Sequence, residues 1–215
     1  MNDTKGGGEK WIKHYSNKQK ILLVGEGDFS FAACLAKAFE NDTSNIIATS
    51  RDSDQDELEK KYANAKSNLE ILEKSNGCVV LHGVDAYTMI KHPVLQNQLF
   101  DRIVFNFPHA DLVYREHDAS QIRLHQDLVQ GFFKSAHKMV KEVGEVHVTH
   151  KTAYPFSRWN IKELASIADL ILLEEVEFNL WDYPGYCNKK GEGHGSNCDM
   201  SFPIGLCSTF KFQKL

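Results

Sequence analysis

The sequence predicts an α/β fold, in which helices cover both faces of a parallel sheet, and three observations support this prediction. From residue 20 onward, short runs rich in β-branched residues alternate with longer segments of helical pattern. The chain of 215 residues is long enough to bury one core of this kind. Its hydrophobic fraction of 42% and charged fraction of 25% are typical of globular proteins. We expect a single domain over residues 19–215, preceded by a flexible basic tail over residues 1–18.

Seven segments have the composition of strands, and the first is the apolar run ILLV. They cover residues 21–24, 45–50, 78–82, 102–105, 145–149, 170–178 and 208–212. Helical patterns separate the first five, and a further short helix follows them; the expected helices cover residues 31–39, 54–74, 86–99, 119–143 and 159–168. Strands joined by helices in this way lie parallel in one sheet.

The last two strand segments depart from this alternation. Between residues 178 and 208 there is no helical pattern, only a segment rich in Gly and Pro. Two successive strands without a crossover helix are most simply an antiparallel pair. A loop of this length in a compact domain is usually functional or disordered.

Composition and charge exclude several classes of protein. No apolar stretch approaches the roughly 20 residues that span a bilayer, and the polar start lacks the apolar core of a secretory signal, so we expect an intracellular protein with no membrane partner. The net charge of −4 gives no general support for nucleic-acid binding, which would depend on the lysines of the tail or on the loop at 186–195.

The cysteines and histidines do not predict a metal site. The five cysteines are scattered without a CxxC pair, so reduced thiols are expected. The metal-ligating side chains late in the chain match no standard zinc spacing: His147, His150, His194 and Cys198. We expect no metal.

A Gly-x-Gly turn follows the first strand. Gly25 and Gly27 allow backbone angles closed to other residues and a close approach of a ligand, and a helix begins near Ser30. The turn lacks the Gly-Lys-Ser/Thr of a P-loop and the third glycine of a dinucleotide fingerprint. Glu26 and Asp28 would repel a phosphate, but they suit a ligand with a cationic end. S-adenosylmethionine, with its sulfonium and ammonium groups, is such a ligand, although the same turn also serves ordinary structural purposes.

Polar residues follow the next three strands. Asp52, or alternatively Ser50 or Asp54, is placed to bind ribose hydroxyls, and Asp85 is placed to bind an adenine amino group. Asn106 ends the fourth strand. The carboxyl ends of parallel strands meet at one edge of the sheet, where ligands bind. The alternative for either Asp is a helix N-cap.

Several motifs together resemble those of one known family. LLVGEGDFSF, ATSRDS, GVDA, FDRIVFNFPH, YPFSRWNIKELA and YPGYCNKKG occur in this order. They are similar to the Rossmann-like methyltransferases typified by a fungal enzyme that methylates N3 of a uridine in large-subunit ribosomal RNA. The plant members end in a segment similar to FPIGLCSTFKF. Some plant relatives are labelled as metal-associated and isoprenylated, but this sequence has no CxxC and ends in FKFQKL, so neither property is expected.

The resemblance implies an S-adenosylmethionine-dependent methyltransferase fold, with seven strands of which the last is antiparallel. It implies S-adenosylmethionine as cofactor, methylation of uridine N3 in ribosomal RNA, and a nuclear or nucleolar location, with the cytoplasm left open. Two alternatives remain: a methyltransferase for a small molecule or protein, and a non-catalytic binding module on the same fold.

The site residues follow from the turn, the strand ends and the resemblance. The expected cofactor-binding residues are Gly25, Glu26, Gly27, Asp28, Phe29, Ser30, Asp52, Asp85, Ala86 and Asn106. Methyltransferases that act on planar nitrogen place an Asn/Asp-Pro-Pro-aromatic motif at the fourth strand; by analogy, Asn106 is catalytic with Phe107 and Pro108 against the base. His109 is the candidate general base or orienting donor, with a surface histidine as the alternative. Aromatic and basic residues of the late loop, Tyr186, Lys189 and Lys190, are expected to bind the substrate.

Overall fold

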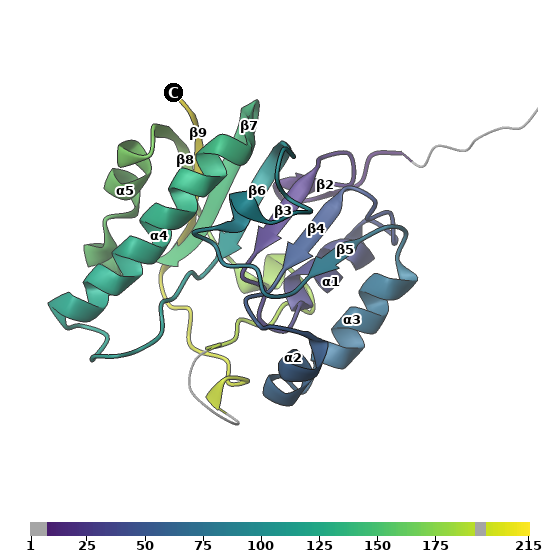
Figure 1. Ribbon diagram of the computed structural model, residues 1–215, viewed down its shortest axis with the longest axis horizontal. Helices are drawn as coiled ribbons and strands as arrows, with labels where there is room; N and C mark the ends of the chain where they lie inside the picture. The colour runs from purple at the N-terminus through teal and green to yellow at the C-terminus, as the bar shows by residue number, and fades with distance from the viewer. Residues whose placement is uncertain (1–7, 192–196) are drawn as a thin grey trace, which may run out of the picture.

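The computed structural model describes residues 8–191 and 197–215 and has a seven-stranded sheet in the order β5-β4-β3-β6-β7-β9-β8 (Figure 1). The strands are β3 (Ile21–Val24), β4 (Ile46–Thr49), β5 (Val79–Leu81), β6 (Phe100–Asn106), β7 (Val140–Lys151), β8 (Leu170–Glu177) and β9 (Cys207–Lys214). The first five pair in parallel, and β9 lies antiparallel between β7 and β8. The predicted fold class, including the antiparallel last strand, is confirmed.

The order of the strands also locates a ligand site. From β3 the chain builds outward through β4 to β5 and then returns to place β6 on the other side of β3. Two crossovers therefore run in opposite directions from neighbouring strands. In open α/β sheets such a point leaves a crevice at the carboxyl ends of the strands.

Helices cover the two faces of the sheet, and alternate residues of β3 point to opposite faces. One face packs against α1 (Ser30–Ala38), α2 (Gln55–Lys61) and α3 (Ala65–Lys74), and the other against α4 (Ala119–Met139) and α5 (Ile161–Ile167). Ile21 and Leu23 are buried in the first core, whereas Leu22 and Val24 are buried in the second. This period of two explains why ILLV is apolar throughout.

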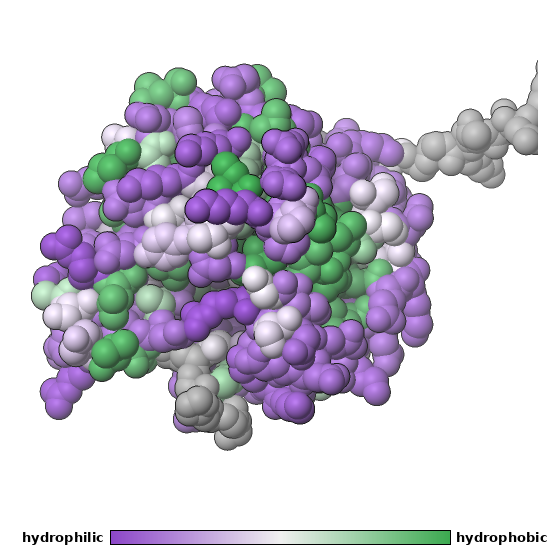
Figure 2. All heavy atoms as spheres, in the orientation of Figure 1, coloured by the Kyte–Doolittle hydropathy of each residue, from purple (hydrophilic) through white to green (hydrophobic). Residues whose placement is uncertain are grey.

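Two of the predicted helices differ from those in the structure. The segment 54–74 is two helices, because Tyr62 ends α2 in an extended conformation, with φ −127° and ψ 115°, and its side chain enters the core. In the segment 86–99 only a 3-10 turn forms, η1 (Met89–Lys91). His92 is extended there because it precedes Pro93, and a residue before proline avoids the helical conformation. The segment 86–99 lies on the same face of the sheet as α4. On that face, Figure 2 shows apolar side chains gathered over β4 and β5, where no long helix covers the sheet.

The other helix boundaries shift by a few residues. The helix predicted to reach residue 143 ends at Met139, and β7 begins at once. The helix predicted at 159–168 is α5, preceded by a 3-10 turn, η2 (Phe156–Trp159). A third 3-10 turn, η3 (Leu180–Asp182), follows β8.

The described part of the predicted tail is folded rather than flexible. β1 (Trp11–Ile12) and β2 (Tyr15–Ser16) form an antiparallel hairpin. The Tyr15 side chain is 1% exposed; its ring packs edge-on against Phe31, and its hydroxyl lies 3.1 Å from His147 Nδ1. Tyr15 therefore anchors the hairpin to α1 and β7, and the ion pairs of Lys10 with Glu40 and of Lys13 with Asp182 add to this attachment. Residues 1–7 lie outside the described residues.

None of the helices within the described ranges is long and apolar enough to cross a membrane.

Candidate functional site

A cleft lies at the carboxyl edge of the sheet, where the order of strands reverses. It brings together nearly all the site residues that the sequence predicts: Gly25, Glu26, Gly27, Asp28, Ser30, Asp52, Asp85, Ala86, Asn106, Phe107, His109, Tyr186, Lys189 and Lys190. Pro108 is buried beside it and lines a second cavity. Phe29 is the exception, because its side chain is 0% exposed and belongs to the core with α1.

The two glycines of the turn differ in backbone conformation and in the space available for a side chain. Gly25 has a φ of +67°, and a Cβ there would lie 2.6 Å from Cε2 of Phe105. Gly27 has an ordinary backbone, and a Cβ there would make van der Waals contact with Lys189 at 3.4 Å. Phe29, rather than Gly27, takes the second left-handed conformation of the turn, with φ 59°. The expected conformational role therefore holds for Gly25 only.

Two carboxyl groups lie in the turn, and both are poorly hydrated. Oε2 of Glu26 accepts a hydrogen bond from the Ala32 amide at 3.1 Å, and burial raises the pKa of Glu26 to about 8. Oδ1 of Asp28 accepts from the Ser30 amide at 3.0 Å, and burial likewise raises the pKa of Asp28. Oδ2 of Asp28 is buried without a hydrogen bond in the described part of the chain, and the nearest cation, Lys189 Nζ, is 3.8 Å away. A carboxylate oxygen left in this state favours a positively charged or hydrogen-bonding ligand.

Ser30 joins the turn to the late loop. Its hydroxyl donates to the carbonyl oxygen of Cys187 at 3.2 Å and accepts from the Cys187 amide at 3.0 Å. The Tyr186 ring packs edge-on against Phe31, with centroids 5.1 Å apart. Ser30 and Tyr186 thus hold the loop against α1, in addition to lining the cleft.

The two aspartates that follow β4 and β5 have different surroundings. Asp54 is the N-cap of α2 and accepts from the Glu57 amide at 2.8 Å, so Asp52 is not the cap. Asp52 instead accepts from the Ser50 hydroxyl at 3.1 Å and pairs with Lys61. Asp85 accepts from the Tyr87 amide at 2.8 Å and so stabilises the turn that follows it. Asp85 thus caps a turn but is not the N-cap of a helix, and Asp52 caps neither.

The segment after β6 bends sharply into the cleft. Asn106 ends the strand, and Phe107 has a left-handed φ of 49° while its amide donates to the Thr149 carbonyl at 2.8 Å. The Phe107 ring packs edge-on against Phe202, with centroids 5.3 Å apart. This bend places the residues of the NFPH motif between the cleft and the second cavity.

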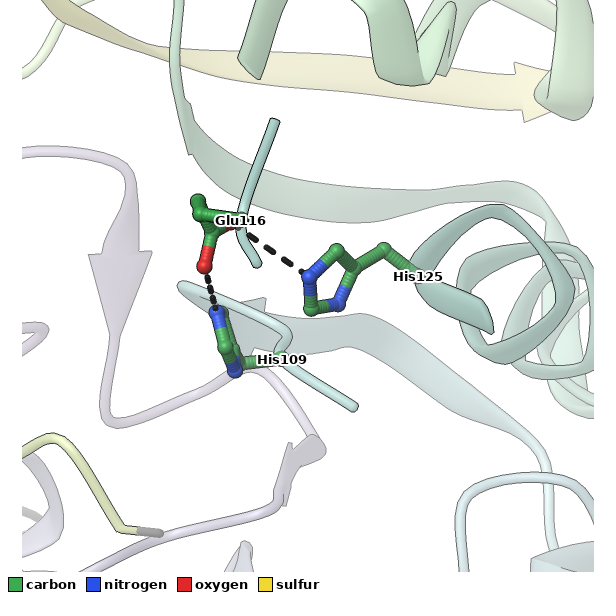
Figure 3. A group of neighbouring side chains, drawn as sticks. All are labelled: His109, Glu116 and His125. Atoms are coloured by element: carbon green, nitrogen blue, oxygen red, sulfur yellow. Dashed lines mark hydrogen bonds and ion pairs between the residues drawn. The ribbon is translucent and has the colours of Figure 1, made fainter. Parts of the chain in front are cut away.

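His109 lies in a group of three side chains that sequence spacing did not indicate (Figure 3). Its Nε2 is 3.1 Å from one carboxyl oxygen of Glu116, and Nε2 of His125 is 3.4 Å from the other. Although burial opposes it, hydrogen bonding to the two histidines lowers the pKa of Glu116 to about 2. Glu116 is therefore a carboxylate, which accepts a hydrogen bond from His109 and lies beside His125.

The ligand atoms of this group lie within 4.8 Å of one another, as in metal sites. The Ala110 amide, however, donates to His125 Nδ1 at 3.1 Å. The side-chain amide nitrogen of Gln121, also a donor, lies 3.3 Å from His125 Nε2, so both ring nitrogens of His125 face N–H groups. Hydrogen bonding accounts for the geometry.

The two lysines expected to bind the substrate differ in exposure and in ion pairing. Lys189 has a side chain that is 8% exposed and pairs with Asp199 at 2.6 Å. Lys190 is exposed. Two further cations at the cleft, Arg51 and Lys61, were not predicted, and both pair with carboxylates. The loop residues 192–196, including His194, lie outside the described residues.

Solved structures with a similar arrangement of strands and helices show which fold the protein has. They include S-adenosylmethionine-dependent methyltransferases, and a methyltransferase from Pyrococcus furiosus matches with a TM-score of 0.54 and 16% identity over 92% of this chain and 76% of that chain. The protein has the fold of this class. Within it, the chain belongs to the BMT5-like family, because the family model described as "rRNA (uridine-N3-)-methyltransferase BTM5-like" matches residues 22–190.

Two relatives show the range of the similarity. Heavy metal-associated isoprenylated plant protein 41 of Arabidopsis thaliana is 51% identical over 98% of this chain, and the chain spans 40% of the length of that relative. The 25S rRNA (uridine(2634)-N(3))-methyltransferase of Saccharomyces cerevisiae is 25% identical over 83% of this chain and 68% of that protein.

Proposed function

We propose that this protein is an S-adenosylmethionine-dependent methyltransferase that methylates N3 of a uridine in large-subunit ribosomal RNA. The observation that carries the proposal is the convergence of the turn at Gly25, the aspartates at 52 and 85, and the NFPH motif in one cleft. The family description and the yeast relative supply the reaction and the RNA. A nuclear or nucleolar location is part of the proposal, because large-subunit ribosomal RNA is assembled there.

The residues present fit the cofactor. Two carboxyl groups lie in the turn, the half-buried Glu26 and the buried Asp28, and one Asp28 oxygen lacks a hydrogen bond in the described residues. They would hold the ammonium end, with Asp52 at the ribose and Asp85 and Ala86 at the adenine, which leaves no place for a pyrophosphate. When bound, S-adenosylmethionine supplies a methyl group activated by a sulfonium.

The chain's own contribution is positioning and proton transfer. Asn106, Phe107 and Pro108 would hold the edge and face of the base, and Lys190 would contact the RNA backbone. Uridine N3 bears a proton that must leave, and His109 would accept it, because it lines the cleft and hydrogen bonds to a carboxylate.

Two experiments test the proposal. Calorimetry should detect binding of S-adenosylmethionine and not of NAD, and Gly27→Arg should abolish that binding, because its long side chain would fill the space toward Lys189 and Tyr62. Mass-spectrometric nucleoside analysis of ribosomal RNA from cells lacking the protein should show a loss of 3-methyluridine. An unchanged amount of 3-methyluridine would overturn the RNA assignment, and binding of NAD alone would overturn the cofactor assignment.

A further inference from the structure

A second cavity of about 150 Å³ adjoins the cofactor cleft, and the two share Phe107, His109, Lys189, Lys190 and Phe202. Its other walls include the aromatic rings of Phe156 and Trp159 from η2. Among the described residues, the Asp, Glu, Lys and Arg side chains that line it are Glu116 and the lysines at positions 151, 189 and 190. The cavity is therefore an aromatic chamber lined in part by three lysines, next to the place where a methyl group would be delivered.

The size and walls of the cavity select for a small planar ring. An apolar protein cavity of about 150 Å³ accommodates benzene, so this cavity has room for one six-membered ring. Nucleobases that are extruded from a helix are bound between aromatic side chains.

Lys151 brings a positive charge to this chamber from the end of β7. Its Nζ lies 4.6 Å from the centroid of Phe156 and 4.7 Å from that of Phe202. An ammonium group held between two rings has a defined position and is only partly hydrated, so it attracts a nearby anionic oxygen more strongly than an exposed lysine does.

Glu116 determines which nitrogen of His109 accepts a proton. Because Glu116 is a carboxylate, His109 Nε2 must be the donor in the 3.1 Å contact between them. In the neutral ring the lone pair is then on Nδ1. His125 Nδ1 accepts from the Ala110 amide, and His125 Nε2 lies 3.4 Å from the other oxygen of Glu116, so the carboxylate lies between the two histidines.

We infer that the second cavity receives the pyrimidine ring of the substrate, with Lys151 as an unassigned substrate-binding residue and Glu116 as the positioning residue of His109. The inference rests on the proposed function. In the reaction, the N3–H bond breaks and the proton goes to His109 Nδ1. The N3 electron pair forms the bond to the methyl group, whose bond to the sulfonium sulfur breaks; that electron pair stays on sulfur, and S-adenosylhomocysteine leaves. Lys151 stabilises the negative charge on the base carbonyl oxygens, and Glu116 stabilises the imidazolium.

Ligand binding tests the cavity without catalysis. Protein saturated with S-adenosylhomocysteine is titrated with uridine monophosphate, and the indole N–H resonance of Trp159 is followed by NMR, because this residue is 1% exposed and lines the cavity. We expect a saturable shift with uridine monophosphate at millimolar concentration, and none with adenosine monophosphate. No shift with uridine monophosphate, or equal shifts with both, would overturn the pyrimidine assignment.

Substitution of Lys151 has a matched control. Lys162 also lies over a phenylalanine ring, with Nζ 5.7 Å from the centroid of Phe210, but on α5 and outside both cavities. Lys151→Met should weaken uridine monophosphate binding and slow single-turnover methylation of unmodified ribosomal RNA by about 100-fold, as expected for loss of one charge-stabilising group. Lys151→Arg should recover part of the rate, and Lys162→Met should have no effect. Equal behaviour of the two methionine variants would overturn the role of Lys151.

Glu116→Gln tests the positioning role. In ¹⁵N NMR the wild-type His109 should show the tautomer protonated at Nε2, and the variant should lose that preference while cofactor affinity stays within about 2-fold. The rate should fall by about 100-fold or more, as for loss of a group that orients a catalytic histidine. An unchanged tautomer with an unchanged rate would overturn the role. If the wild-type protein methylates ribosomal RNA and the variants do so at the same rate, this inference fails and the proposed function stands. If the wild-type protein methylates no RNA, the proposed function fails.

Discussion

At Gly25 the backbone is left-handed, with φ +67°, and the space for a Cβ is filled by the Phe105 ring. Gly25→Ala should therefore lower the free energy of unfolding by about 1–3 kcal/mol, through backbone strain and displacement of the ring. At Gly27 the backbone is ordinary and the nearest atom is at 3.4 Å. Gly27→Ala should change the free energy by no more than about 0.5 kcal/mol. Urea denaturation of the two variants without cofactor measures the difference, and equal losses would contradict it.

Glu26 makes the stability of the cofactor-free protein depend on pH. Burial raises its folded pKa from 4.5 to about 8, so between these values the folded state binds more protons than the unfolded state. Stability should therefore fall as pH rises from about 5 to 8, by at most about 1.4 kcal/mol per pH unit from this group. Glu26→Gln keeps an acceptor for the Ala32 amide and removes the titration, so its stability should fall less.

The measurement is the urea unfolding free energy of both proteins at several pH values. Glu70→Gln, on the exposed side of α3, is the control and should follow the wild type. Parallel curves for wild type and Glu26→Gln would mean that Glu26 titrates normally in the folded protein.

Among the elements, α4 positions the segment that carries Asp85 and Ala86. Ser135 on α4 donates to the Tyr87 carbonyl at 2.6 Å, and a Cβ at Gly131 would lie 2.1 Å from Cδ1 of Tyr87. The helix thus approaches the segment at a residue without a side chain. This contact holds the segment that follows β5, and with it Asp85 and Ala86, against α4.

Gly131→Ala should destabilise the protein by about 1–3 kcal/mol, although alanine is favoured over glycine inside a helix by about 1 kcal/mol. In a Tyr87→Ala background the same change should be neutral or stabilising, because the ring is gone. A double-mutant cycle by urea denaturation measures this coupling. An additive cycle would show that Tyr87 moves aside without cost. Cofactor affinity of the single variant should also fall, because Asp85 and Ala86 would shift.

The elements also show what a single sequence can predict. The strands were predictable because burial on both faces makes them apolar throughout, as in ILLV, and the strand-end residues met in one cleft because parallel topology requires it. The chamber was not predictable. Glu116 and Lys151 come together across 35 positions through an irregular loop and the end of β7, and no spacing rule describes such a contact. Tyr15 was missed because one buried aromatic residue among charged neighbours has no period.

For the whole molecule, the net charge of −4 is compatible with an RNA substrate only if few phosphates are contacted. Most cations at the cleft are already balanced: Lys61 by Asp52, Arg51 by Asp111 and Lys189 by Asp199. Lys190 is exposed, and no ion pair holds it within the described ranges. With Lys151 it leaves about two cations for RNA.

The affinity for single-stranded RNA should therefore depend only weakly on salt. Each phosphate contact contributes a slope of about −0.7 in log affinity against log salt concentration. Because Lys190 is assigned to the backbone and Lys151 to the base, the slope should lie between about −0.7 and −1.4. Lys190→Met should reduce its magnitude by about 0.7, and Lys162→Met should not change it. Fluorescence anisotropy of a labelled oligonucleotide in increasing KCl measures the slope. A slope steeper than about −4 would require more phosphate contacts than these two residues supply, and would assign RNA binding to a basic surface elsewhere.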